Sequence, residues 1–213
     1  MPGILYPTQI KYLKQFKKDE DPLITEMEQY AKEHNVPILS WHSAAFLEQV
    51  ISMINPKRVL EIGTAIAYST IRIAKVLKKK SVIHTIEMSE DNAIIAKENI
   101  EKSGLVDKID LKIGNALSIM PQLQKKYDLI FLDADKEDYK RLFDYSMILL
   151  KRGGVIFVDN LLWHGLAATK KVPKEYKIST KFIREFNKVF MNQPNLTSTI
   201  LPIGDGIGLG IKK

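Results

Sequence analysis

The chain has 213 residues, 45% hydrophobic and 27% charged residues, a formal net charge of +7 and no cysteine. Disulfides, thiol catalysis and thiolate metal sites are therefore excluded, and we expect a cytoplasmic protein, since cysteine-free chains suit a reducing compartment. No apolar run approaches 18 residues, so no transmembrane helix is expected, and the N-terminus lacks the pattern of a signal peptide.

The first 55 residues are predicted to be helical. Asp21 followed by Pro22 has the pattern of a helix N-cap with proline at the first helical position, and apolar residues follow at helical spacing. A further helix is predicted over about 43–55. We expect residues 1–55 to form a helical extension packed on a single domain that spans residues 1–213.

From Arg58 onward, predicted strands alternate with predicted helices. The strands are expected at 58–62, 81–87, 110–113, 127–133 and 155–159. The helices are expected at about 67–78, 89–103, 117–124, 138–150 and 178–191. Residues 151–154 are expected to form a tight turn, and Asp205-Gly206 predicts a hairpin between the last two strands. This alternation predicts an α/β fold with a parallel sheet covered on both faces and an antiparallel pair at the C-terminus.

Two apolar strands end in oxygen-bearing side chains. Asp133 closes the strand at 127–133, and Asp159 followed by Asn160 closes the strand at 155–159. Ligands of such sheets bind beyond the carboxyl ends of the strands, and neighbouring strands lie about 4.8 Å apart, so these oxygens would converge if the two strands are neighbours. An all-oxygen set suits Mg²⁺, Mn²⁺ or Ca²⁺ rather than zinc; the alternative is that Asp133 is an ordinary turn residue.

Lys136 follows Asp133 by three residues. In a crevice beside a cation, a lysine can accept a proton. Taken alone, Lys136 fits better as a surface lysine of a first helical turn. His164 and Trp163 come just after the proposed metal ligands and could line the mouth of a substrate site.

The turn after the first strand contains Gly63, but the other glycines of a dinucleotide fingerprint are missing, which disfavours a pyrophosphate cofactor and a dehydrogenase. Glu61 could pair with an ammonium group. Glu87 ends the second strand, where an acid typically binds ribose hydroxyls, and Asn115-Ala116 could pair with an adenine edge. A cationic nucleoside without phosphate, such as S-adenosylmethionine, fits this set; the alternative is a generic α/β domain with acidic loops.

With these residues in view, the chain resembles the cation-dependent O-methyltransferase family, which includes catechol and caffeoyl-coenzyme A O-methyltransferases. The resemblance runs from about Leu39 to Lys213 and rests on "LEIGT…YS", Glu87, "GNAL", "LDADK.DY" and "VDN". It implies the Rossmann-like fold of class I S-adenosylmethionine-dependent methyltransferases. That fold has a mostly parallel seven-stranded sheet with an antiparallel C-terminal hairpin, here preceded by extra N-terminal helices.

The resemblance also implies roles for individual residues. The ligands of a divalent cation, usually magnesium, would be Asp133, Asp159 and Asn160. The residues that bind S-adenosylmethionine would be Leu39, Glu61, Gly63, Ser69, Glu87, Asn115, Ala116, Asp133 and Asp135. Lys136 matches the proposed general base and would act together with Asp133. One departure is Ala67, where many members have glycine, and we do not expect it to abolish cofactor binding.

The methyl acceptor is suggested by the positive net charge of the chain and by its "VDNLLWHG" segment. The chain looks most like the short bacterial branch of the family that methylates 5-hydroxyuridine in the tRNA anticodon, because of its length, its "VDNLLWHG" segment and its positive charge. Lysines of the N-terminal helices and of residues 170–181 would then meet phosphates, although a solvated lysine-rich surface would also explain them. A small catechol or phenol is the alternative acceptor, and a non-catalytic RNA-binding protein is a third possibility. The family is often dimeric, so a homodimer joined through the N-terminal helices is expected, without a membrane partner.

Overall fold

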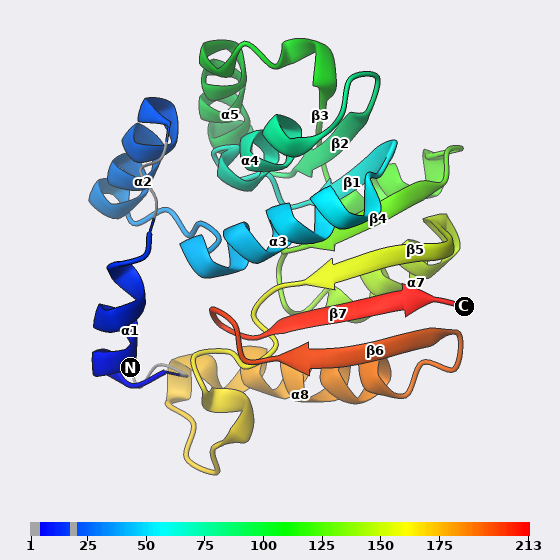
Figure 1. Ribbon diagram of the computed structural model, residues 1–213. Helices are drawn as coiled ribbons and strands as arrows, with labels where there is room; N and C mark the ends of the chain where they lie inside the picture. The colour runs from blue at the N-terminus through cyan, green and yellow to red at the C-terminus, as the bar shows by residue number, and fades with distance from the viewer. Residues whose placement is uncertain (1–4, 18–20) are drawn as a thin grey trace.

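A sheet of seven strands forms the middle layer of the molecule (Figure 1), in a computed structural model that describes residues 5–17 and 21–213. The strands are β1 (Arg58–Ile62), β2 (Val82–Glu87), β3 (Ile109–Ile113), β4 (Tyr127–Leu132), β5 (Leu150–Val158), β6 (Leu196–Leu201) and β7 (Ile207–Lys212). Their order across the sheet is β3-β2-β1-β4-β5-β7-β6. The first five in this order are parallel, and β7 is antiparallel to both β5 and β6. The predicted α/β fold with an antiparallel C-terminal hairpin is confirmed.

In the part of the chain that the structure describes, three helices precede the first strand, and the other helices lie between strands. The helices are α1 (Pro7–Lys14), α2 (Pro22–His34), α3 (Trp41–Ile54), α4 (Tyr68–Val76), α5 (Glu90–Ser103), α6 (Ala116–Ile119), α7 (Tyr139–Leu149) and α8 (Lys177–Met191). The predicted cap of α2 is present, since the Asp21 side chain accepts a hydrogen bond from the backbone N–H of Leu23. In α5, the Ser89 hydroxyl accepts a hydrogen bond from the backbone N–H of Asn92 in the same way. Gly104 ends α5 in the left-handed conformation.

The core has two apolar layers, one on each face of the sheet. Helices α2 to α5 cover one face with buried residues that include Ile24, Leu47, Ile51, Ile71 and Ile100. Helices α7 and α8 cover the other face with buried residues that include Leu142, Phe143, Ile183, Phe186 and Phe190. Figure 1 shows α3 crossing in front of the sheet and α8 behind β6 and β7. Because both faces of the sheet are covered, a ligand is expected at the carboxyl ends of the strands.

Two predicted elements differ from the structure. The turn predicted at 151–154 lies within β5, which begins at Leu150, opposite Tyr127, and continues after a register shift. Gly153 has a φ of +72°, so the irregular start of the strand takes up the bend that the sequence suggested. The helix predicted at 117–124 is the short α6 followed by a 3₁₀ turn at Met120–Gln122, because Pro121 has no backbone N–H to continue an α-helix.

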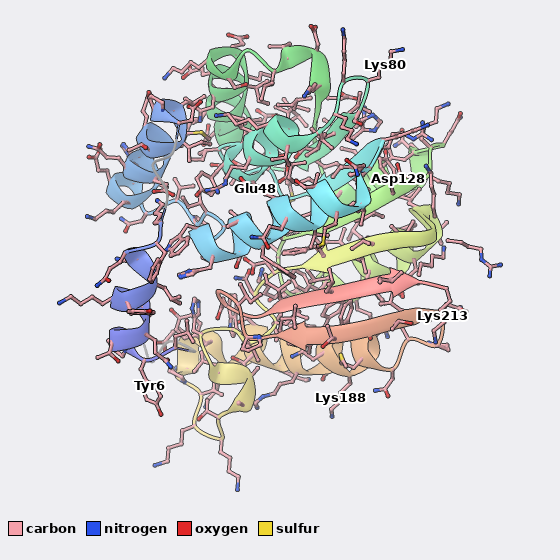
Figure 2. All side chains as sticks on the ribbon, in the orientation of Figure 1. Tyr6, Glu48, Lys80, Asp128, Lys188 and Lys213 are labelled. Carbon is pink, nitrogen blue, oxygen red and sulfur yellow. The ribbon has the colours of Figure 1, made fainter. Side chains whose placement is uncertain are left out.

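The N-terminal helices leave aromatic side chains in solvent. Tyr6, Tyr12 and Phe16 are 75%, 60% and 61% exposed, and none of the eight residues of α1 is buried. Figure 2 shows Tyr6 directed away from the rest of the chain. The homodimer stays a prediction. Among the described residues, no helix has the length and apolar character needed to cross a bilayer.

Candidate active site

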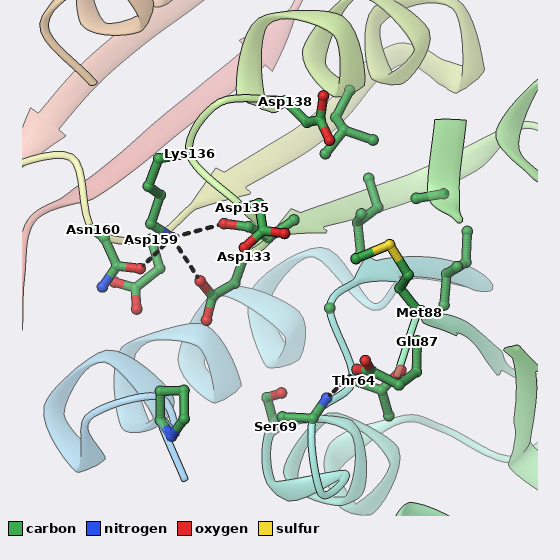
Figure 3. A pocket seen from close by; sticks show the side chains of 18 of the residues that line it. Thr64, Ser69, Glu87, Met88, Asp133, Asp135, Lys136, Asp138, Asp159 and Asn160 are labelled. Carbon is green, nitrogen blue, oxygen red and sulfur yellow. Dashed lines mark hydrogen bonds and ion pairs between the residues drawn. The ribbon is translucent and has the colours of Figure 1, made fainter. Parts of the chain in front are cut away.

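A cavity of about 470 Å³ lies at the carboxyl ends of the parallel strands. Because the strand order reverses between β1 and β4, the connections that leave β1 and β4 diverge and open a crevice between them. Residues that line the cavity come from the segments that follow β1, β2, β3, β4 and β5, and from the segment before α3 (Figure 3). The predicted site residues in its wall are Leu39, Gly63, Ser69, Glu87, Asn115, Ala116, Asp133, Asp135, Lys136, Asp159 and Asn160, together with Trp163 and His164.

Glu61 is the predicted site residue that does not line this cavity. Its carboxylate is fully buried and accepts hydrogen bonds from the hydroxyls of Ser69, Thr70 and Thr85, at 2.5, 2.5 and 2.7 Å. The expectation that Glu61 faces the crevice is therefore corrected, because the pleat of β1 turns it toward α4, on the same face as Val59. Ser69 stands between Glu61 and the cavity.

Burial raises the pKa of Glu61 to about 7, against the opposing effect of the three hydroxyls. An acid whose pKa is raised on folding stabilises the fold at low pH, and this stability is lost as the pH rises from about 4.5 to about 7. Without cofactor, Glu61→Gln should therefore melt several degrees above the wild type at pH 8, whereas the two proteins should melt alike at pH 5. The free energies of unfolding at pH 8 should differ by an amount on the order of 3 kcal/mol. Thermal unfolding of both proteins at the two pH values tests this prediction. An equal difference in melting temperature at pH 5 and pH 8 would show that ionisation of Glu61 does not destabilise the fold.

Glu87 is held in place by the backbone. Its carboxylate accepts hydrogen bonds from the N–H groups of Ala65 at 2.7 Å and Ser89 at 2.8 Å, and its side chain faces the cavity. Asn115 caps α6 through Oδ1, which accepts from Leu117, so its Nδ2 is the group available to a ligand. Carboxylate oxygens have further lone pairs, so Glu87 can accept hydrogen bonds from a diol.

Gly63 brings the turn after β1 against the end of β4. Its φ is +98°, and a Cβ atom at this position would lie 1.8 Å from the carbonyl oxygen of Asp133. Only glycine allows this approach. Ala67 also has a positive φ, of 69°, but it is buried as the N-cap of α4 and is not part of the cavity wall, so it does not narrow the cavity.

The acidic end of the cavity is organised around one ammonium group. Lys136 Nζ lies within hydrogen-bonding distance of four acceptors: Asp133 Oδ1 at 3.2 Å, Asn160 Oδ1 at 2.8 Å, the Ala134 carbonyl at 3.0 Å and the Tyr139 hydroxyl at 2.6 Å. The Lys136 side chain is only 9% exposed. The loop after β4 thus brings Asp133 and Lys136 together with the end of β5, as the sequence predicted.

Asp159 is a buried carboxylate that lacks a partner on one oxygen. It is 4% exposed, and its Oδ1 has no hydrogen bond within the described part of the chain. Burial raises its pKa well above the ordinary value, and the neighbouring Asp133 carboxylate raises it further. A buried carboxylate of this kind needs a compensating positive charge, and two carboxylates with the Asn160 amide oxygen are a donor set that suits a hard cation.

Histidine, aspartate and glutamate alone do not make a metal cluster of three or more anywhere in residues 5–17 and 21–213. The candidate donor set of Asp133 and Asp159 would take its third oxygen from the Asn160 amide.

Two neighbours of this cluster were not assigned from the sequence. The Tyr139 hydroxyl accepts from Lys136 and donates to the Asp159 carbonyl at 3.1 Å. The Asp205 carboxylate accepts from the Asn160 amide and from the His164 backbone N–H. Tyr139 follows Lys136 by three residues, a helical spacing that could have indicated contact. Asp205 was assigned to a hairpin only, but β7 starts where the antiparallel β5 ends, which places that hairpin at the site.

Comparison with known proteins agrees with this geometry. A family model described as O-methyltransferase matches residues 14–213. The caffeoyl-CoA O-methyltransferase 1 of Eucalyptus globulus is 32% identical over 204 residues, which cover 91% of this chain and 82% of that protein. A Bacillus cereus O-methyltransferase in complex with SAH has a TM-score of 0.84 and 28% identity, with 95% of this chain and 96% of that chain covered. The Streptomyces achromogenes O-methyltransferase TomG, in complex with SAM, has a TM-score of 0.84 and 25% identity, with 95% of this chain and 94% of that chain covered.

Proposed function

The chain belongs to the O-methyltransferase family and is an S-adenosylmethionine-dependent O-methyltransferase, and we propose that it also requires a divalent cation and methylates 5-hydroxyuridine in a tRNA anticodon. The observation that carries the cation requirement is the buried, partly unpartnered carboxylate of Asp159 beside Asp133 and Asn160. Such a cluster is costly in a protein unless a cation balances it.

In this proposal, Asp133, Asp159 and Asn160 hold the cation, most simply Mg²⁺, with Mn²⁺ or Ca²⁺ as hard-cation alternatives. A bound divalent cation lowers the pKa of an acceptor hydroxyl whose oxygen it contacts. The acceptor should therefore present two adjacent oxygens. The O5 hydroxyl and the O4 carbonyl of 5-hydroxyuridine meet this requirement, and so do the two hydroxyls of a catechol.

The other half of the cavity would hold the methyl donor. Glu87, fixed by two backbone N–H groups, binds the ribose hydroxyls, and Asn115 with Ala116 binds the adenine. Ser69 contacts the methionine part, with the buried Glu61 carboxyl group hydrogen-bonded behind it. Leu39, which precedes α3, and Asp135, which follows β4, also line the cavity and complete the wall of this half.

Lys136, once it has released one proton to solvent and is a neutral amine, would take the proton of the acceptor hydroxyl. The resulting oxyanion would attack the sulfonium methyl group in line, so that an O–C bond would form as the C–S bond breaks and S-adenosylhomocysteine leaves. Asp133 connects the two halves, because its side chain contacts Lys136 and its backbone packs against Gly63 in the turn that follows β1. Holding both reactants in contact supplies much of the acceleration.

A basic groove supports a phosphate-rich acceptor. The residues that line a hollow of about 650 Å³ along α8 and the loop before it are Lys170, Lys171, Val172, Lys177, Lys181, Arg184, Glu185 and Lys188. Arg184 is used internally, since it donates to the carbonyls of Leu166, Ala167 and Thr169. Within the described residues, the ammonium groups of the five lysines make no hydrogen bond or ion pair, and Figure 2 shows Lys188 extending outward from α8.

One hydrogen bond links the cavity wall to the helix that carries the groove. Trp163 lines the cavity, and its indole N–H donates to the Ser179 hydroxyl of α8 at 3.1 Å. In this proposal, a ligand whose reacting ring enters the cavity extends its backbone phosphates along α8 toward the lysines. The relatives named as caffeoyl-CoA O-methyltransferases suggest the alternative acceptor, a small molecule with adjacent phenolic oxygens.

The acceptor is tested by offering purified protein, Mg²⁺ and S-adenosylmethionine either tRNA that bears 5-hydroxyuridine or free catechols and caffeoyl-CoA. Methyl transfer to the tRNA, lost with a chelator, is expected. The double variant Lys177→Gln/Lys181→Gln should raise KM for tRNA about tenfold, leave kcat nearly unchanged and flatten the salt dependence of binding.

The matched control for the groove is Lys79→Gln/Lys80→Gln, which removes the same charge from the turn before β2, at the amino edge of the sheet. This control should bind tRNA like the wild type. Methyl transfer to catechols with none to the tRNA would overturn the proposed acceptor. An equal loss of tRNA affinity in both double variants would show that the groove does not bind the tRNA.

A further inference from the structure

The segment that carries Asn160 has an unusual backbone. Asn160, Trp163 and His164 have φ values of 62°, 47° and 55°, and Gly165 follows at 77°. The left-handed conformation costs a residue with a Cβ atom about 1–2 kcal/mol. Three such residues within five positions persist only where neighbouring groups fix them.

Asp205 is one of the groups that fix this segment. Its Oδ1 accepts a hydrogen bond from the His164 backbone N–H at 2.5 Å, and its own carbonyl accepts one from the Leu162 N–H at 2.9 Å. Its Oδ2 lies 3.4 Å from Asn160 Nδ2 and 3.7 Å from His164 Nδ1. The Asp205 side chain is 18% exposed, so these contacts are shielded from water. The turn between β6 and β7 thus holds the segment after β5 through the Asp205 carboxylate as well as through backbone hydrogen bonds.

The Asn160 amide lies between two groups of opposite kind. Lys136 Nζ can only donate and faces Oδ1 at 2.8 Å, whereas the Asp205 carboxylate can only accept and faces Nδ2. An amide in the reverse orientation would place its NH₂ group against an ammonium and its oxygen against a carboxylate. The two neighbours therefore determine the orientation of the amide by chemistry.

We propose that Asp205 is a positioning residue that orients the Asn160 amide, so that its oxygen faces the same side as Asp133 and Lys136. The inference rests on the proposed cation function, in which that oxygen is a ligand. Lys136 alone cannot keep the amide oriented once a cation competes for Oδ1, whereas Asp205 contacts the other end of the amide and stays in place. A reversed amide would present hydrogen atoms to the cation.

Binding of Mn²⁺ alone, measured by electron paramagnetic resonance or calorimetry, tests the inference without any turnover. Asp205→Asn should weaken Mn²⁺ binding about 10–100-fold, because loss of a residue that orients a ligand has effects of this size. The asparagine oxygen can still accept from the His164 N–H, so the fold should persist. The control is Ser179→Ala, which frees Trp163 in the same segment without touching Asn160 and should bind Mn²⁺ within about twofold of the wild type.

A second variant, Asn160→Asp, distinguishes orientation of the Asn160 amide from a general effect of the Asp205 charge. In Asn160→Asp there is no amide to orient, and the new carboxylate would face Asp205. Adding Asp205→Asn there should leave Mn²⁺ binding unchanged or tighten it. Equal weakening in both backgrounds would show that only the charge of Asp205 matters and would overturn the inference, as would wild-type affinity in Asp205→Asn.

The two proposals fail in different ways. A wild-type protein that binds no Mn²⁺ would sink the cation function, whereas a wild type that binds and an Asp205→Asn that binds equally would sink only the role of Asp205. If circular dichroism shows Asp205→Asn unfolded, Asp205→Glu takes its place. It keeps the charge but displaces the carboxylate, and it should weaken Mn²⁺ binding about tenfold; unchanged affinity there would likewise refute the inference.

Discussion

Asp159→Ala should lower methyl transfer by about 10³-fold or more while binding of S-adenosylmethionine is largely kept. Asp159 contributes to the proposed cation set, and several kcal/mol of transition-state stabilisation depend on a divalent ion held there. The residues proposed for the nucleoside, such as Glu87, are held by backbone groups that Asp159 does not contact. Initial rates at saturating Mg²⁺ and calorimetry with the cofactor measure the two effects, and full activity would refute the metal role.

The same variant should be more stable than the wild type when no metal is added. Asp159 is 4% exposed, one of its oxygens has no hydrogen-bond partner among the described residues, and Asp133 lies close enough to raise its pKa. Removing a carboxylate from such surroundings relieves a cost that function requires, so the melting temperature should rise by several degrees. Asp144→Ala, which removes an exposed carboxylate from α7, is the control and should change neither stability nor rate.

The positions of Asp133 and Asp159 could be predicted because they depend on a local pattern and one general rule. An apolar run followed by an acid marks the end of a buried strand, and the carboxyl ends of parallel strands share one edge of the sheet. The sequence also indicated Glu87 in this way. These residues needed no knowledge of distant contacts, since β1, β2, β4 and β5 are all parallel.

The surroundings of Glu61 and Asp205 could not be predicted in the same way. Glu61 is one residue from the end of β1, and a shift of one residue along a strand moves a side chain to the other face. It therefore lies under α4, opposite Thr85 of β2, and the register that brings these together is a property of the sheet. Asp205 reaches Asn160 across 45 positions through the antiparallel return of β7, a long-range contact that no local pattern contains.

Lys136→Ala should lower kcat by about 10²–10⁴-fold, the usual contribution of a general base. It should also tighten Mn²⁺ binding, because the Lys136 ammonium donates to Asp133 Oδ1 and Asn160 Oδ1, the oxygens proposed as ligands. A variant that binds the ion better and reacts more slowly would separate a role in proton transfer from a role in building the site. Titration with Mn²⁺ and single-turnover rates measure the two effects.

Lys136→Arg distinguishes the two roles further. Arginine keeps a positive charge that can donate to Asp133 and Asn160, but a guanidinium does not release its proton in a protein. If Lys136 takes the acceptor's proton, the arginine variant should be as slow as the alanine variant. Both should then speed up about tenfold per pH unit below the pKa of the acceptor hydroxyl, because an acceptor ionised beforehand needs no base. A wild-type rate in Lys136→Arg, or a flat pH dependence in Lys136→Ala, would show that the lysine only holds Asp133 and Asn160 in place.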